Sequence, residues 1–445
     1  MRYFYYLLIL TIISCEKQVI EPIKQPVTLP PINTTTSVKV DTTITLKSQE
    51  ITFNQSGVST DSLYNTLLFS TAGALNYVIN GVEHLILTPS LQTRNLSPLH
   101  FVKKDTTWVF AGSSDEVKLG NPRNYKIDKD GTVYYAEQGL EYSPNGRLPF
   151  GDLWRVKTNG DILTWTKISN QKSFFHDVAI GDINNDGKTD VVGAHLGTNY
   201  ENWLNEGLLP FISKDSYYEE ARDYLYFTNL KQGAGATLIA DLDKDGKNEI
   251  IQGDYALGSW RTMSDRFSLL IFSQVNGRYN SLVKPELGAW TEPSVGATSI
   301  KSSDFDNDGD LDLAVAYETN KNTNGIQIFE NKGNLIFVAT QKIEISFNVN
   351  QFREFEIMDV DKDGFNDIVT HPFHYGNMFR TQTGIILQNN ILLNKNNKFI
   401  YCEKTLPVDI NPGFMKGFMI NNNLKFIGVE YQNGKFKIQE VIIKL

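Results

Sequence analysis

Four nine-residue stretches of the chain follow one pattern of acidic, amide and glycine residues. They read DINNDGKTD at 182–190, DLDKDGKNE at 241–249, DFDNDGDLD at 304–312 and DVDKDGFND at 359–367. Each has an acidic or amide side chain at positions 1, 3 and 5, a glycine at position 6 and a carboxylate at position 9. Calcium binds about six to eight oxygen atoms in proteins, and glycine permits the sharp turn that such a loop needs. The pattern therefore predicts a calcium-binding loop at each stretch.

The predicted ligands in each loop are the side chains at positions 1, 3, 5 and 9 and the backbone carbonyl at position 7. Loop by loop, they are Asp182, Asn184, Asp186, Lys188 and Asp190; Asp241, Asp243, Asp245, Lys247 and Glu249; Asp304, Asp306, Asp308, Asp310 and Asp312; and Asp359, Asp361, Asp363, Phe365 and Asp367. Without a cation, carboxylates crowded into one loop would repel one another. Ordinary turns rich in Asp, Asn and Gly are the alternative. Four copies in one register favour calcium, with one ion for each of the four loops.

The residues around the loops exclude the EF-hand. An EF-hand has a bidentate Glu at position 12, where this chain has Gly193, Gln252, Val315 and Thr370. The runs that follow the loops, DVVGAH, EIIQGD, DLAVAY and DIVTHP, are short and mostly rich in β-branched residues, without a helical period. We therefore expect each loop to connect two β-strands.

The spacing of the loops predicts the architecture. Their first residues, at 182, 241, 304 and 359, are separated by 59, 63 and 55 positions. A period of about 60 with strand-like flanks is typical of one four-stranded blade of a β-propeller. Weaker copies stand in register at Asn80-Gly81, at 128–131 and at 421–423. With these copies the chain is expected to be all-β, with a single seven-bladed β-propeller domain over 41–445.

The segment HDVAIGDINNDGKTDVVGAHLGT resembles the FG-GAP/VCBS repeats, which are the calcium-bearing blades of integrin α-chain heads and of many bacterial surface proteins. The resemblance is strong over 175–375 and weak in the rest of the chain. It implies a seven-bladed propeller that holds Ca²⁺ in loops between adjacent strands of a blade. It implies no single function.

The first residues of the chain read as an export signal. Arg2 precedes a largely apolar run from Tyr3 to Ile13, which is too short to cross a bilayer core of about 30 Å as a helix. The sequence IISC at 12–15 resembles the lipobox of bacterial lipoproteins, in which the peptide is cut before the cysteine and the cysteine is acylated. We expect a signal peptide over 1–14, lipidation at Cys15 and a tether rich in Pro and Thr over 15–40. An ordinary secretory signal with a chance cysteine is the alternative.

The residues after the lipobox cysteine indicate a location. Glu16-Lys17 lacks the Asp that commonly retains bacterial lipoproteins in the inner membrane, so the resemblance implies an outer-membrane lipoprotein that faces the cell surface or the periplasm. The other cysteine, Cys402, is expected to be a small core residue.

The segments after the second strands are expected on the face opposite the calcium loops, since the strands of a blade alternate in direction. These segments carry aromatic, charged and histidine side chains, which suit the binding of a glycan or a protein. The candidate ligand-binding residues are His195, Tyr200, Trp203, Asp254, Tyr255, Trp260, Arg261, Tyr317, His371, His374 and Tyr375. The alternative is that the aromatic rings pack between blades. Pro372 argues against a helix that would align His371 and His374 on zinc.

The net charge of −9 at pH 7 argues against a nucleic-acid partner.

The expected function is that of a lipid-anchored, calcium-stabilised propeller that binds a glycan or protein ligand at the bacterial cell surface. A calcium-assisted polysaccharide lyase or hydrolase is the alternative, although the chain contains no GxSxG, HExxH or phosphate-binding glycine motif. A structural subunit of an outer-membrane complex is a third alternative, because a fold does not fix a function.

Overall fold

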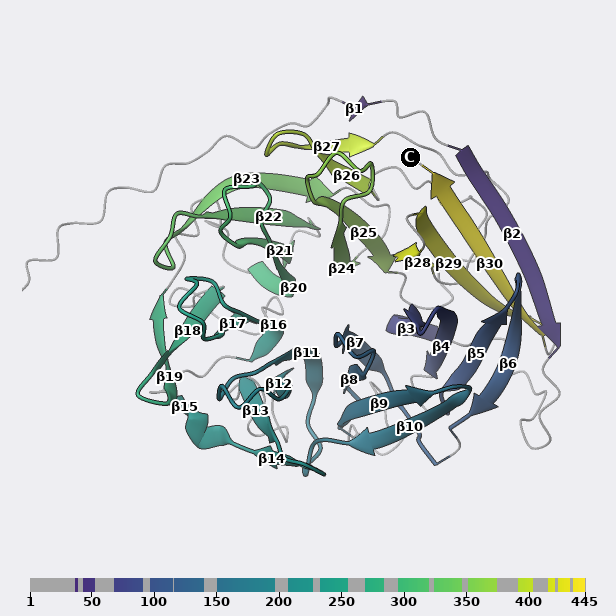
Figure 1. Cartoon of the computed structure of the whole chain (residues 1–445), viewed down its shortest axis with the longest axis horizontal. Helices are drawn as coiled ribbons and strands as arrows, with labels where there is room; N and C mark the ends of the chain where they lie inside the picture. The colour runs from purple at the N-terminus through teal and green to yellow at the C-terminus, as the bar shows by residue number, and fades with distance from the viewer. Residues whose placement is uncertain are drawn as a thin grey trace, which may run out of the picture.

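The computed structural model describes residues 37–38, 43–52, 68–90, 97–114, 116–139, 150–196, 207–226, 233–254, 269–283, 295–319, 324–345, 351–373, 391–402, 415–420, 423–432 and 435–444. These residues form seven β-sheets arranged around a central axis, like the blades of a propeller (Figure 1). Within the described ranges the one helical element is a 3₁₀ turn, η2 (Arg222–Tyr224). None of these ranges forms a helix with the length and hydropathy of a membrane span. The prediction of an all-β, seven-bladed β-propeller is confirmed.

The first four blades follow one another along the chain, each with its strands in order from the axis outward. Blade 1 contains β3 (Leu68–Ile79), β4 (Val82–Ser90), β5 (Leu99–Lys104) and β6 (Thr107–Ser113). Blade 2 contains β7 (Pro122–Ile127), β8 (Val133–Glu137), β9 (Leu153–Asn159) and β10 (Ile162–Lys167). Blade 3 contains β11 (Phe175–Gly181), β12 (Asp190–His195), β13 (Leu208–Ser213) and β14 (Tyr218–Glu220). Blade 4 contains β16 (Ala234–Ala240), β17 (Glu249–Asp254), β18 (Leu269–Val275) and β19 (Arg278–Val283), with β15 (Leu225–Tyr226) on its outer edge.

The last three blades complete the ring. Blade 5 contains β20 (Val295–Ser303), β21 (Asp312–Thr319), β22 (Asn324–Asn331) and β23 (Phe337–Ile345). Blade 6 contains β24 (Gln351–Met358), β25 (Asp367–Phe373), β26 (Ile391–Asn394) and β27 (Phe399–Cys402). Blade 7 joins β28 (Met415–Ile420), β29 (Asn423–Gln432) and β30 (Lys435–Lys444) to β2 (Thr43–Thr52) from the other end of the chain.

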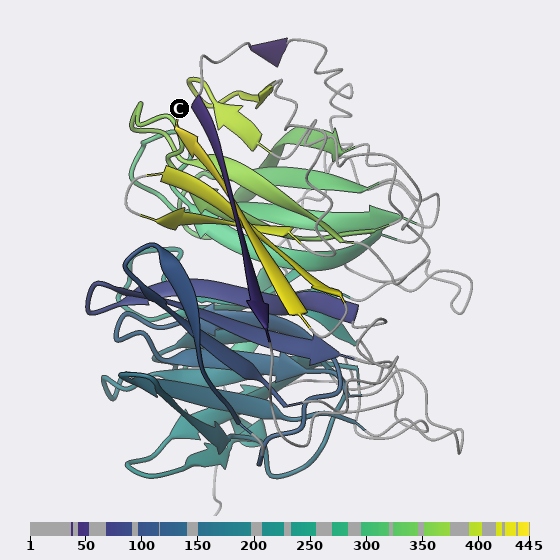
Figure 2. The ribbon, with the colours of Figure 1, turned by 90° about the vertical axis from the view of Figure 1, so that its right-hand side faces the viewer.

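The ring is closed by β2, which is the outermost strand of blade 7. It pairs antiparallel with β30 over its whole length, with Thr43 opposite Lys444 and Thr52 opposite Lys435. Figure 2 shows β2 in purple beside β30 in yellow. Residues 43–52 therefore belong to the last blade, and blade 1 starts at Leu68.

The end of the predicted tether adds to a blade. β1 (Ser37–Val38) pairs in parallel with β27, with Ser37 opposite Tyr401 and Val38 opposite Cys402. The outer strand of a sheet can accept another strand because the backbone groups on its open edge are unpaired. Cys15 and the rest of the tether before residue 37 lie outside the described residues.

The hydrophobic core is divided among the interfaces between neighbouring blades. Inner strands are covered on both faces, so every residue of β12 and β17 is buried, whereas no residue of the outer strand β10 is. A strand buried on both faces needs a nearly continuous apolar run, which is what the loop flanks supply. Cys402 is buried in the cluster between blades 6 and 7, which confirms its predicted place in the core.

Some neighbouring blades approach so closely that only glycine fits between them. A Cβ atom added to Gly253 in blade 4 would lie 2.4 Å from the Cβ of Ala297 in blade 5. Real Cβ atoms do not approach one another this closely, so the blade spacing depends on the missing side chain.

Candidate metal-binding loops

The four acidic loops each join the first strand of a blade to the second, in blades 3, 4, 5 and 6. Two residues of every loop have a left-handed backbone. Position 4 has φ between 58° and 62°, and the glycine at position 6 has φ between 80° and 96°. The four loops thus share one backbone conformation at these two positions. They lie on one face of the disc because they connect equivalent strands of an antiparallel sheet.

Hydrogen bonds from backbone N–H groups hold the loop carboxylates in place. The carboxylate at position 1 accepts a bond from the glycine at position 6, at 2.7 Å from Gly187 to Asp182 and at 3.0–3.1 Å in the other three loops. The carboxylate at position 5 accepts a bond from the N–H of position 7, at 2.8–3.0 Å. These hydrogen bonds from the backbone fix the carboxylates at positions 1 and 5 relative to the loop.

The carboxylates at position 9 begin the second strands and are buried. In the fourth loop, one oxygen of Asp367 accepts a bond from the Val360 N–H at 2.8 Å and the other from the Asn394 N–H at 2.7 Å. Burial raises the pKa of these groups more than such bonds lower it. The pKa is about 6 for Asp190 and Asp312 and about 7 for Glu249 and Asp367. The protein alone therefore stabilises the charged forms of these carboxylates poorly. A bound cation would stabilise them.

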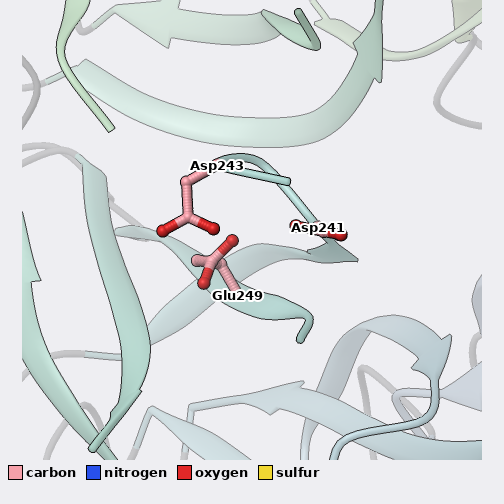
Figure 3. A group of neighbouring side chains, drawn as sticks. All are labelled: Asp241, Asp243 and Glu249. Carbon is pink, nitrogen blue, oxygen red and sulfur yellow. The ribbon is translucent and has the colours of Figure 1, made fainter. Parts of the chain in front are cut away.

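Three of the loops gather carboxylates into clusters that could hold a metal ion such as Ca²⁺. Within each cluster the ligand atoms lie within 4.8 Å of one another. The clusters are Asp241, Asp243 and Glu249; Asp304, Asp306 and Asp308; and Asp359, Asp361 and Asp367. Figure 3 shows the carboxylates of Asp243 and Glu249 pointing toward one another, with Asp241 beside them.

One buried carboxylate oxygen in each of these clusters accepts no hydrogen bond from the described part of the chain. These atoms are Oδ1 of Asp241, Oδ1 of Asp304 and Oδ1 of Asp361. A buried polar atom without a partner is costly, and a donor set made only of oxygen atoms suits a hard cation. The residues of the three loops therefore fit calcium.

The loop at 182–190 differs from the other three. Its third position is Asn184, whose amide Nδ2 donates to Asp186 at 3.2 Å. This loop is not among the clusters found in the described residues, so its calcium site stays a prediction.

Side chains from the next blade bond to three of the four loops, which the sequence pattern does not indicate. Asn331 of β22 donates to the Leu242 carbonyl at 2.8 Å, and Asn394 of β26 donates to the Phe305 carbonyl at 2.7 Å. In the same way, the Tyr279 hydroxyl donates to the Ile183 carbonyl at 3.1 Å. All three carbonyls belong to position 2 of a loop in the preceding blade. The shape of each of these three loops is thus coupled to the next blade.

The weak copy of the pattern in blade 2 is satisfied by protein groups. Asp128 accepts a bond from the Thr189 hydroxyl at 2.6 Å, and Asp130 accepts one from the Thr132 N–H at 2.8 Å. At the ninth position Tyr134 replaces the carboxylate and is buried. In blade 1, Asn80 and Gly81 both have positive φ, as the tight turn of a two-residue hairpin requires. Positions 421–422 lie outside the described residues.

Three of the candidate ligand-binding residues have described side chains, and all three are buried. His195, Asp254 and Tyr317 are at most 3% exposed. His195 bonds the Ser173 hydroxyl at 2.7 Å, and its pKa is lowered to about 3 by burial and by Arg222. These three belong to the interior and form no exposed face. The side chains of Tyr200, Trp203, Tyr255, Trp260, Arg261, His371, His374 and Tyr375 lie outside the described residues, so their role stays a prediction.

Comparison with known families supports the repeat. Residues 304–370 match the FG-GAP-like repeat, and this range runs from the first residue of the third loop into the strand after the fourth. The chain is therefore a seven-bladed β-propeller that contains an FG-GAP-like repeat. No curated protein matches the chain.

Solved structures with similar folds are distant in sequence. The Dos1 propeller is 8% identical, with a TM-score of 0.42 over 80% of this chain and 75% of that one. The SapL1 lectin in complex with alpha methyl fucoside is 9% identical, with a TM-score of 0.41 over 78% and 99%. The periplasmic gluconolactonase PpgL of Pseudomonas aeruginosa is 11% identical, with a TM-score of 0.45 over 81% and 96%. Likenesses this remote carry no argument about what this chain binds.

Proposed function

We propose that this protein is a calcium-stabilised β-propeller, anchored to the outer membrane by a lipid on Cys15, that binds a glycan or protein ligand at the bacterial cell surface. The observation that carries the calcium part is the clustering of carboxylates around buried oxygens that lack partners in blades 4, 5 and 6. All four loops, including 182–190, would bind one ion each.

The position of the loops favours a stabilising role for calcium. Each loop joins the two inner strands of its blade, and three of the four are bonded to the next blade through the carbonyl at position 2. A cation that binds the folded loops and not the unfolded chain adds its binding free energy to the stability of the fold. Calcium would therefore hold both the blades and the contacts between them.

The ligand part of the proposal is supported by the lengths of the connections after the second strands. Residues 196–207, 255–268 and 374–390 separate β12 from β13, β17 from β18 and β25 from β26, and each range is longer than an acidic loop. They contain Trp203, Trp260 and Arg261 among their aromatic and charged residues. Long connections on a rigid scaffold are where binding sites are concentrated.

The ligand proposal is tested by measuring binding of the mature protein to a glycan panel and to outer-membrane protein extracts, followed by purification of each ligand. We expect saturable binding that is weakened by Trp260→Ala and Trp203→Ala while the melting temperature is unchanged. Turnover of a polysaccharide without such binding would favour the enzyme alternative. Binding that survives both substitutions would remove these residues from the site.

The membrane partner is tested at Cys15. We expect mass spectrometry of the membrane-bound protein to find an acylated N-terminal cysteine, and we expect Cys15→Ala to release the protein from the outer-membrane fraction. A Cys15→Ala protein that stays in that fraction would contradict the anchor.

A further inference from the structure

In each of blades 3 to 6, two consecutive residues near the end of the third strand lie beside the acidic loop. The first residue of the pair donates a backbone N–H or a hydroxyl to the carboxylate at position 9. These residues are Ser213, Ser273, Asn331 and Asn394. The residues that follow them are Lys214, Gln274, Lys332 and Lys395. Three of the four loops thus have a lysine at the same place.

The lysines differ in where their ammonium groups bind. In blade 3, Lys214 bonds Glu219 at 3.1 Å, and in blade 5, Lys332 bonds Glu330. Neither glutamate belongs to a loop. In blade 6, Lys395 bonds Asp361 and lies 2.5 Å from Oδ2 of Asp363. These carboxylates occupy positions 3 and 5 of the fourth loop, so the lysine pairs with two predicted calcium ligands.

The fourth loop thus combines a metal-binding arrangement with a cation supplied by the protein. Asp361 is a member of the carboxylate cluster, and its Oδ1 is buried without a hydrogen-bond partner among the described residues. The side chain of Asp361 is 14% exposed and that of Lys395 is 37% exposed. The ion pair is therefore partly shielded from water, and its attraction is stronger than that of a fully exposed pair.

We infer that Lys395 is a tethered competitor for the cation of the fourth loop, and that it makes this loop the weakest calcium site of the four. This inference rests on the proposed calcium binding. Calcium must displace the ammonium before it can use the oxygens of Asp361 and Asp363. The loop at 241–249 has the neutral Gln274 at the same place. Its own Lys247 lies 3.2 Å from Asp245, so a lysine there pairs with one predicted ligand, whereas Lys395 pairs with two. A weak site beside tighter ones would fill and empty as the calcium concentration changes, while the tighter ones stay filled.

The inference is tested by titrating the chelated mature protein with calcium chloride and fitting the affinity of each class of site. We expect one weak class in the natural protein, and we expect Asp361→Asn to abolish it. Lys395→Gln, which copies the residue of blade 4, should tighten that class by at least about tenfold, because an opposing positive charge is removed. Lys395→Met should do the same, and Lys395→Arg should leave the class weak.

Lys214→Met is the matched control, because Lys214 has the same place in blade 3 and bonds a glutamate outside the loop. It should leave every affinity unchanged. Circular dichroism of each variant checks that it folds. If the calcium affinity of the weak class of site is unchanged in both Lys395→Gln and Lys395→Met, the inference is overturned. Four equally tight sites in the natural protein would overturn it while leaving the proposed calcium binding intact, whereas no bound calcium at all would overturn both.

Discussion

The carboxylates at position 9 serve two purposes in their loops. Asp312, for example, accepts backbone bonds from Phe305 in its own loop and from Asn331 in the third strand, at 3.0 and 2.9 Å. Burial raises its pKa to about 6 in the absence of metal. The same side chain thus organises the loop and contributes charge that favours a cation.

The raised pKa values predict an unusual pH dependence for the metal-free protein. The four position-9 carboxyls have folded-state pKa values of about 6 to about 7, above the value of about 4 expected in the unfolded chain. The folded protein therefore binds more protons, and these groups contribute stability at low pH that is lost as the pH rises through 7. We expect the melting temperature in chelator to fall between pH 5 and pH 8, and to fall much less with calcium. A chelated protein that becomes steadily more stable over this range would contradict the assignment.

Single ligands can be tested by exchanging a carboxylate for an amide. Asp304→Asn keeps an acceptor for the Gly309 N–H, which lies 3.0 Å from Oδ2 of Asp304. It removes the negative charge of the carboxylate whose Oδ1 has no hydrogen-bond partner among the described residues. We expect the variant to bind about one calcium ion fewer, because carboxylates dominate such sites. Asp130→Asn, in the weak copy of blade 2, should bind as much calcium as the natural protein. Metal content by mass spectrometry measures both, and equal content in the two variants would count against the third loop.

At the residue scale, the sequence indicates the candidate metal ligands because they lie within nine consecutive residues, and the turn of the backbone fixes their spacing. The bonds that complete the loops come from far along the chain. Asn331 is 89 residues from Leu242, and Lys395 is 32 residues from Asp363. No pattern within a nine-residue window contains these partners, so the sequence does not indicate them.

At the scale of elements, the repeat period predicts the blades because each blade brings its own inner strands and turn. The period does not predict that β2 joins the last blade, because β2 pairs with β30 across almost the whole chain. The pairing of β1 with β27 is likewise non-local. A period describes the sequence of the blades, while ring closure depends on the two ends meeting.

The close packing of blades 4 and 5 gives a prediction for Gly253. Gly253→Ala places a Cβ 2.4 Å from that of Ala297, so the blades must separate, at a cost of about 1–3 kcal/mol in unfolding free energy. Gly112→Ala is the control, because a Cβ there meets nothing within 4 Å. Urea unfolding of both variants in calcium checks the difference. Equal stability of the two would show that the blades can adjust.

At the scale of the whole molecule, the joint between the first and last blades contains a buried cluster of charges. Lys103 of blade 1 lies 2.6 Å from Glu440 of blade 7, and Lys425 of blade 7 lies 2.5 Å from it. Glu83 bonds both lysines, and the indole N–H of Trp108 donates to Glu440 at 3.1 Å. Burial opposes the charge on Glu440, but the two lysines outweigh it and lower its pKa.

Removal of one charge from this joint is expected to weaken ring closure strongly. Glu440→Gln leaves two buried ammonium groups to share Glu83, and breaking a buried ion pair in this way costs about 3–5 kcal/mol. Glu50→Gln breaks the exposed pair of Glu50 with Lys435, which also lies in blade 7, and should cost less than about 1 kcal/mol. Thermal unfolding compares the two variants. A small and equal loss in both would show that β2 alone closes the ring.

We propose that calcium in the acidic loops stabilises this propeller. The most direct measurement is the metal content of the mature protein, together with its melting temperature in millimolar calcium and after chelation. We predict about four calcium ions per chain, one for each loop, and a large fall in melting temperature when they are removed. A protein that binds no calcium and melts at the same temperature in both conditions would reduce the four loops to ordinary turns.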